Sequence, residues 1–536
     1  MIRRIIAVLV VAANLFVAVP AAQASDLPTV FTLGEGGVGD SQHSTYTRFT
    51  PNGNGGYSSD ITCSNLETGG CSQETLTSLR ANVWAQVELP YCETASQDFC
   101  IESVKIYQDG QTPEDATFQY EAFPNWAKPA PAPEYGITSI GQPLVFKSAG
   151  VKSKEGSDLF LVQAGLHYNI DPQLNFVPSI SEMKLSVFPV NISRNDDWAF
   201  AQTFEADTRV SVTLRAPKGV GGWFKGRMAN VSAAIEDFDA TDYKLTVDAQ
   251  IVQLPVAKMS LNIDQLNELK AAHPDRWNFL KAGIESGAEG DGLFSYLDDM
   301  RPYTADTNFA VSTAWYLVSF SGNDYDSCNA GQTGLVGLVT TNATTYTGRP
   351  PTMIDTKMQF QVGGFHYAPD GTSIAYGIYD LLIKDPVARC IYGLPAEGDL
   401  VGTTEVTDDG TANPATTKFE VVNGFAHFSA TGFHYSSPLI KTSLSSTAKY
   451  FSTSGKLSAG GTAKVGKTLK AVVGKITGSP AATYQWLRNG KKISGATKQS
   501  YKVTSKDKNT LLSVTVTLKA SGYVKAIKTL KWSKTK

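Results

Sequence analysis

The sequence has few of the residues that most enzymes use for covalent or metal chemistry. Its 536 residues include six His and six Cys. It has no His-Glu-x-x-His pair, no Gly-x-Ser-x-Gly elbow and no Gly-rich loop placed between a strand and a helix. These absences argue against zinc peptidases, α/β-hydrolases and nucleotide-binding enzymes. No catalytic residue is assigned, and whether the protein is an enzyme stays open, leaning towards a non-enzyme.

Acidic residues are almost absent from the C-terminal part of the chain. Residues 451–536 contain 17 Lys and one Arg but a single acidic residue, Asp507. Residues 25–450 contain 27 basic and 49 acidic residues, so a body of charge −22 precedes a tail of charge +17. Such charges act at long range on partners of opposite sign and say nothing about the fold. The tail therefore predicts an anionic partner.

The longest hydrophobic run lies near the N-terminus, in residues 5–19. Arg3 and Arg4 precede the run, and Ala22-Gln23-Ala24 offers the small residues that a signal peptidase requires. The run is too short to predict a membrane span. We expect residues 1–24 to be a secretory signal and the mature protein to begin near Ser25, outside the cell.

The cysteines agree with export, because disulfides persist in oxidising compartments. Six cysteines allow 15 connectivities, and their clustering favours pairing between neighbours. We predict three disulfides: Cys63–Cys71, Cys92–Cys100 and Cys328–Cys390. The alternative, a zinc site, is disfavoured because the chain has no Cys-x-x-Cys pair and no His near the four clustered thiols.

Turn dipeptides between short β-branched runs recur along the chain. Asn and Gly tolerate the positive φ of a type I′ turn, so Asn423-Gly424 and Asn489-Gly490 predict hairpins. The only helical pattern begins at Asn262, a good N-cap, and continues through a second helix that carries Trp277, Leu280 and Ile284. The predicted fold class is all-β, with several β-sandwich domains and a short helical insertion between two of them.

Composition shifts predict the domain boundaries, since a chain of this length exceeds what one core usually serves. The seven expected segments are a signal peptide (1–24), a disulfide-containing β region (25–122), a Pro-rich connector (123–136), a β-sandwich region (137–258), a helical hairpin that links or caps (259–304), a β-sandwich domain (305–449) and a lysine-rich domain (450–536).

Two segments are candidates for binding in the body. The glycines around Trp223 and Phe224 could hold both rings in an exposed loop suited to carbohydrate, although core packing is the favoured interpretation. Asp237 and Asp239 are candidate ligands for calcium, and the acidic segment around them could also serve sugar chemistry. A solvated acidic loop remains the favoured interpretation. No other cofactor is predicted.

A short motif of Gly, an apolar residue, His and Tyr occurs three times, with His167, His366 and His434 at its third position. A shared three-His metal centre is one interpretation. Successive side chains of a strand face opposite ways, so each His more naturally points to solvent while its neighbours are buried. We therefore expect the motif to mark a repeated strand and bulge.

The tail carries a specific set of motifs. Residues 461–469, Tyr484-Gln485-Trp486, Asn489-Gly490, residues 500–504 and Gly522-Tyr523 together resemble the immunoglobulin-like repeat at the C-terminus of many secreted actinobacterial proteins. This resemblance covers about 80 residues and implies an accessory β-sandwich without catalytic residues. The body, through residues 365–372, 379–382, 388–393 and 436–441, resembles uncharacterised secreted actinobacterial proteins.

Three functions follow as hypotheses. The leading one is a secreted, envelope-associated protein whose cationic tail binds anionic wall polymers or glycans, through exposed lysines such as Lys491, Lys492, Lys506 and Lys508. The alternatives are a secreted glycan-acting hydrolase with an accessory wall-binding module, and a calcium-stabilised adhesion or ligand-binding module. Nucleic acid is not an expected partner, because the tail lacks the stacking aromatics of a single-strand binder.

Overall fold

The structure is a computed structural model that describes residues 29–33, 48–53, 81–125, 128, 130–133, 137–170, 178–196, 198–276, 292–320 and 325–536. The predicted signal peptide, Cys63, Cys71 and the predicted helix around Trp277 lie outside these residues. The described chain consists mainly of strands, which confirms the all-β prediction. Within it, no helix is long and apolar enough to cross a membrane.

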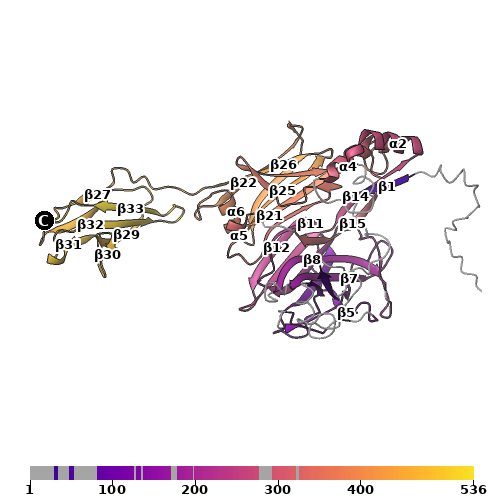
Figure 1. Cartoon of the computed structure of the whole chain (residues 1–536), viewed down its shortest axis with the longest axis horizontal. Coiled ribbons are helices and arrows are strands. Elements are labelled where there is room, and N and C mark those ends of the chain that lie inside the picture. The colour runs from indigo at the N-terminus through magenta and orange to yellow at the C-terminus, as the bar shows by residue number, and fades with distance from the viewer. Residues whose placement is uncertain are drawn as a thin grey trace, which may run out of the picture.

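One 13-stranded sheet organises the body (Figure 1). Its strands follow the order β2 (Arg48–Gly53), β3 (Ala81–Glu88), β7 (Leu159–Ile170), β8 (Pro178–Asn191), β16 (Tyr316–Ser319), β11 (Gly221–Arg227), β17 (Gly334–Thr341), β21 (Tyr376–Lys384), β25 (Phe425–His434) and β24 (Thr416–Val422), with β5 (Thr117–Glu121), β6 (Leu144–Lys147) and β9 (Phe200–Ala201) at the side. The pairs are antiparallel except β11 with β17. The sheet therefore crosses both segments, 123–136 and 259–304, at which the sequence predicts boundaries.

Two smaller sheets pack on this large sheet and create two sandwiches. The first consists of β12 (Ala229–Asp237), β13 (Asp242–Gln250), β10 (Thr208–Pro217) and β4 (Cys100–Gln108). The second consists of β18 (Thr345–Tyr346), β20 (Lys357–Gly363), β26 (Leu439–Ser446), β22 (Leu400–Asp408), β23 (Thr411–Ala412) and β19 (Thr352–Ile354). Each has its own apolar core, so the body is two sandwiches that share one layer.

A third small sheet carries the helices. It comprises β1 (Thr29–Leu33), β14 (Val252–Leu261) and β15 (Ala310–Ala314). Helix α2 (Ile263–Ala272) follows β14 directly, and Asn262 caps it as predicted, through a capping box with Gln265. A 3₁₀ turn (Pro274–Arg276) follows, and α4 (Gly292–Thr304) packs its buried Leu297 and Met300 against Met259 of β14.

The C-terminal module is a separate two-sheet sandwich that stands away from the body in Figure 1. Its sheets contain β27 (Leu457–Gly460), β28 (Thr468–Val473) and β31 (Ser500–Lys502), and β30 (Lys491–Lys492), β29 (Ala481–Arg488), β32 (Leu512–Lys519) and β33 (Ala526–Lys531), with a 3₁₀ turn at Ser505–Asp507. Trp486 is fully buried and stacks on Trp532. Asn489 and Gly490 have the positive φ of the predicted turn.

Two described cysteine pairs are joined as neighbour pairing predicts. Cys92 is bonded to Cys100 at the start of β4. Cys328 of α5 (Asp326–Asn329) is bonded to Cys390 of α6 (Asp385–Ile391), which fixes two short helices beside the second sandwich. These disulfides are compatible with an extracellular protein.

Candidate functional site: an Arg–Asp–His cluster beside a cleft

Helix α4 ends in a cluster of charged side chains. Its apolar face holds it on β14, so Arg301 in its last turn points towards the loops that follow β20 and β25. The chain leaves the helix through Ala305 and Asp306, whose φ angles of 50° and 55° are left-handed. Such backbone is costly for residues with a Cβ and persists only where the surroundings hold it.

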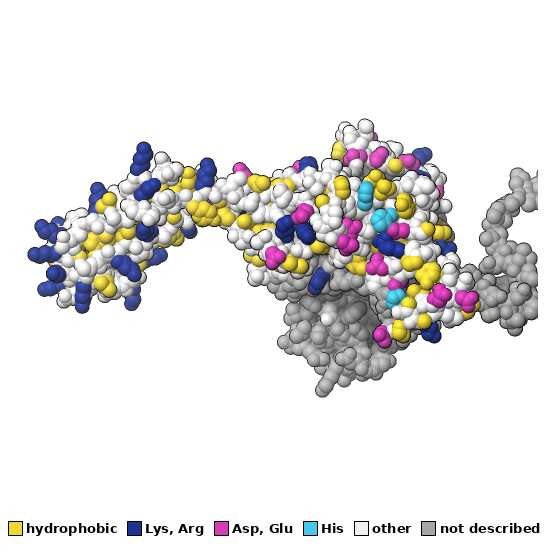
Figure 2. Space-filling view, turned by 90° about the horizontal axis from the view of Figure 1, so that it is seen from above, with side chains coloured by type: hydrophobic (Ala, Val, Ile, Leu, Met, Phe, Trp, Pro, Cys, Tyr) yellow, Lys and Arg dark blue, Asp and Glu magenta, His cyan; other side chains and the backbone are white. Residues whose placement is uncertain are grey.

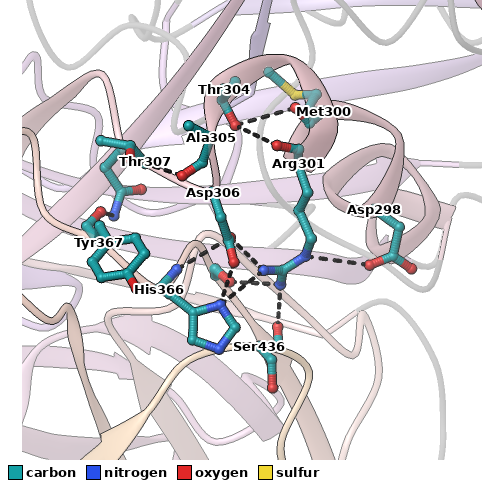
Figure 3. A network of polar contacts seen from close by, with 12 residues as sticks. Asp298, Met300, Arg301, Thr304, Ala305, Asp306, Thr307, His366, Tyr367 and Ser436 are labelled. Atoms are coloured by element: carbon teal, nitrogen blue, oxygen red, sulfur yellow. Dashed lines mark hydrogen bonds and ion pairs between the residues drawn. The ribbon is translucent and has the colours of Figure 1, made fainter. Parts of the chain in front are cut away.

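Asp306 joins Arg301 to His366 (Figure 3). One carboxylate oxygen accepts hydrogen bonds from the Arg301 guanidinium and from the His366 backbone N–H, the latter at 3.2 Å. The other oxygen pairs with His366 Nδ1. An imidazole whose Nδ1 is held by a carboxylate has a fixed ring orientation, and its Nε2 is the nitrogen left for other partners.

Arg301 also fastens the helix to two loops. Its Nη2 donates to the backbone carbonyls of Gly364 and Ser436, both at 2.7 Å. Asp408 of β22 lies near enough to His366 and Arg301 to feel their charges. Burial, followed by repulsion from Asp409, raises the pKa of Asp408, although His366 and Arg301 oppose the change. The hydrogen bonds of Arg301 therefore tie α4 to the loops that follow β20 and β25.

In the cluster, the Asp306 carboxylate orients the His366 imidazole, as an acidic residue does for the catalytic histidine of many enzymes. The His366 side chain is 42% exposed. Among the described residues, no Ser, Thr or Cys side chain forms a hydrogen bond with it, so the nucleophile–base hydrogen bond of a dyad is not formed there. What the contacts establish is a clamp that links separate elements.

A cleft of about 480 Å³ is lined in part by Ala368, Pro369, Ile374 and Ala375, which follow His366 of the cluster in the chain. Its lining comes from three sheets. These residues are Ala229, Asn230 and Gln250 of the first small sheet, Val252, Gln253, Pro255 and Val311 of β14 and β15, and Tyr376, Ile378 and Thr431 of the shared sheet. The sequence did not predict this cleft, because its lining residues are far apart in the chain. The Asn and Gln side chains among them do not form a recognisable sequence motif.

The cleft does not contain the carboxyl pair of a glycosidase. Its one acidic lining residue is Asp207. Glycosidases of either stereochemistry require two carboxyls on opposite sides of the sugar bond, roughly 5 to 9.5 Å apart. Within the described lining that pair is absent.

Trp223 and Phe224 are core residues. Trp223 is 4% exposed and Phe224 is fully buried, both within strand β11. Gly337 on the neighbouring strand β17 leaves the space that the Trp223 ring fills, since a Cβ there would lie 2.3 Å from the ring. The interpretation of both as exposed binding residues is therefore wrong.

Asp237 and Asp239 lie at the end of the β12–β13 hairpin without a metal-like arrangement. One oxygen of Asp239 accepts hydrogen bonds from Thr241 and Asp242, and these bonds lower its pKa. The Lys218 ammonium contacts both the Asp237 carboxylate, at 3.1 Å, and the Asp239 carbonyl. A lysine thus stands between the two candidate ligands. No metal-binding cluster occurs among the described residues.

The three motif histidines do not form a metal-binding group within the part of the chain that the structure describes. His167 lies on β7 beside Glu182, His366 belongs to the cluster, and His434 lies on β25 against the Tyr376 ring. Their preceding apolar residues are fully buried, as predicted for strands. Strand bulges occur beside His167 and at Gly432, as expected for those two copies. The copy at His366 lies in a bend after the end of β20, so it does not mark a strand.

The lysines of the C-terminal module are spread over its surface (Figure 2). All 17 are exposed except Lys456 and Lys528, which are partly buried. Lys491, Lys492, Lys506 and Lys508 are among the exposed ones. Within the described chain none of the module's lysines is paired with a carboxylate; its ion pair is that of Arg488 with Asp507.

Residues 461–468 have the Gly, Lys and Thr spacing of a phosphate-binding loop. They connect strands β27 and β28, so no helix N-terminus follows to hold a phosphate. The pattern therefore has no phosphate-binding geometry.

The fold and these sites define a class: an all-β protein of two fused sandwiches with a cationic terminal sandwich. No protein-family model and no curated protein matches the sequence.

Proposed function

We propose that the protein is exported and associated with the cell envelope, where the cationic module attaches to anionic wall polymers and presents the acidic body. One observation carries this proposal: the module exposes 15 lysines while its one acidic side chain, Asp507, is fully buried. Every charged side chain on its surface is therefore positive, and a polyanion meets no repulsion from any face.

Asp507 serves the fold of the module. Its carboxylate accepts hydrogen bonds from Arg488, Tyr501 and Thr504. Burial alone would raise its pKa, but these hydrogen bonds outweigh burial and lower it. The residue thus stays ionised inside the module and adds no negative charge to its surface.

No specific observation favours either alternative, the glycan-acting hydrolase or the calcium-stabilised module. The described cleft lining holds one carboxylate, which does not favour a hydrolase of the two-carboxyl type. Lys218 lies between the candidate calcium ligands. The resemblance of the module to an immunoglobulin-like repeat of secreted proteins agrees with an accessory attachment role.

The experiment measures binding of the full chain to immobilised poly(glycerol phosphate). The variant Lys491→Gln/Lys492→Gln removes two exposed charges from the β29–β30 hairpin. We expect the affinity to fall about fivefold for each lysine, as a charge near an anionic surface contributes about 1 kcal/mol. The matched control is Lys152→Gln/Lys154→Gln, two exposed lysines of the body. Equal losses in both variants, or none in the first, contradict attachment through the module.

A further inference from the structure

The cleft has the features of a ligand site. Its volume of about 480 Å³ lies within the range of roughly 300–1,000 Å³ that is common for small-molecule sites. Its lining combines strands of three sheets, so it lies at a junction, where such sites often occur.

The lining of the cleft is apolar with interspersed amides. Asn308 is 3% exposed, and its Nδ2 donates to the Tyr367 carbonyl while its Oδ1 accepts no hydrogen bond from the protein. A buried acceptor without a partner is costly, so this oxygen favours a ligand that brings a donor. Asn342, by contrast, is satisfied by Tyr435, Ile378 and Tyr376 and serves the wall.

Exposed apolar side chains, among them an aromatic ring, also line the cleft. Tyr376 is 52% exposed, and its ring rests against His434 with centroids 5.5 Å apart. Ile374 and Val311, also in the lining, are 41% and 45% exposed. A supported and half-exposed aromatic ring of this kind suits the C–H face of a sugar, as aromatic faces pack on apolar surfaces while leaving polar edges free.

The near absence of charge in the described lining favours an uncharged ligand. Asp207 is the one charged residue in the described lining, so an ionic ligand would find no cluster of opposite charges there. Asp207 and Asn230 also have left-handed φ angles of 56° and 49°, a form of strain that concentrates at binding sites. We propose that the cleft binds one or two residues of a neutral glycan, with a hydroxyl donating to Asn308 and a sugar ring on Tyr376.

The experiment titrates the full chain with maltotetraose, cellotetraose, β-mannotetraose and β-galactotetraose, using calorimetry and saturation-transfer NMR. A buffer with about 1 M NaCl shortens the Debye length to about 3 Å and suppresses attraction to the lysines of the module. We expect at least one tetrasaccharide to bind with a Kd below about 1 mM. Absence of binding by all four would overturn the proposal.

Three variants test whether the glycan binds in the cleft. Tyr376→Ala removes an exposed ring, so folding should be kept, and we expect about tenfold weaker binding. Tyr376→Phe keeps the ring and should bind as the parent does. Asn308→Ala should also weaken binding, provided that its melting temperature matches that of the parent.

The matched control is Tyr450→Ala, which removes a 70% exposed tyrosine from outside the cleft. Binding that survives Tyr376→Ala, or falls equally in Tyr450→Ala, contradicts the cleft as the site. The attachment proposed for the lysine-rich module is independent of either outcome, because it involves a different part of the chain.

Discussion

At the scale of single residues, the structure separates charges that support the fold from charges that face a partner. Glu88 on β3 is 1% exposed, and burial raises its pKa to about 7, although the charge of Lys184 opposes this. Because the folded pKa lies above the unfolded value of 4.5, the folded state binds this proton more tightly. The contribution of Glu88 to stability is complete below about pH 4.5 and is lost as the pH rises through about 7.

Glu88→Gln should therefore stabilise the protein at alkaline pH. At pH 8 its free energy of unfolding should exceed that of the parent by about 3 kcal/mol, and near pH 4.5 the two should be similar. Urea unfolding at both pH values measures the difference. Glu205→Gln, at an exposed carboxyl, is the control. A gain from Glu88→Gln that does not depend on pH would refute the buried-charge explanation.

At the scale of elements, Arg301 connects α4 to loops from two strands. Arg301→Lys replaces a planar fork by a single ammonium, which cannot reach Asp306, Gly364 and Ser436 together. We expect a loss of about 2 kcal/mol. Hydrogen exchange should accelerate in residues 364–367 and 436–437 and stay unchanged in β10.

The control for this variant is Arg349→Lys, at an exposed arginine in the loop after β18. It should leave hydrogen exchange unchanged throughout. If Arg301→Lys also leaves hydrogen exchange in residues 364–367 unchanged, the cluster does not hold these loops in place. A functional role for His366 is then the better explanation.

Some local features of the fold could be predicted from the sequence, and others could not. Neighbouring residues were sufficient to predict the Asn262 helix cap and the Asn489-Gly490 turn. The burial of Trp486 was predicted from its position in a strand. Trp223 could not be placed from its neighbouring glycines, because Gly337, more than a hundred residues later, makes room for it.

The sites depend on contacts that are distant in sequence. Asp306 and His366 are 60 residues apart, and the amides of the cleft come from several parts of the chain. No local pattern marks them, since their proximity follows from the packing of α4, its following loop and strands of several sheets. The sequence therefore predicted the fold class, one helix start and the charged module, and missed the cluster and the cleft.

At the scale of the whole molecule, two fused sandwiches carry most of the acidic residues, and a third sandwich carries half of the lysines and one acidic residue. The module stands apart in Figure 1, and Phe451 stacking on Tyr523 holds the chain that enters it. This arrangement leaves the lysines accessible to a polymer while the cleft of the body remains a separate surface.

The most direct test is the retention of the full chain on poly(glycerol phosphate) as NaCl rises from about 50 to about 500 mM. If several lysines displace counterions, the affinity should fall about a hundredfold or more across this range. Retention that is unchanged at high salt would contradict attachment through the positive surface of the module.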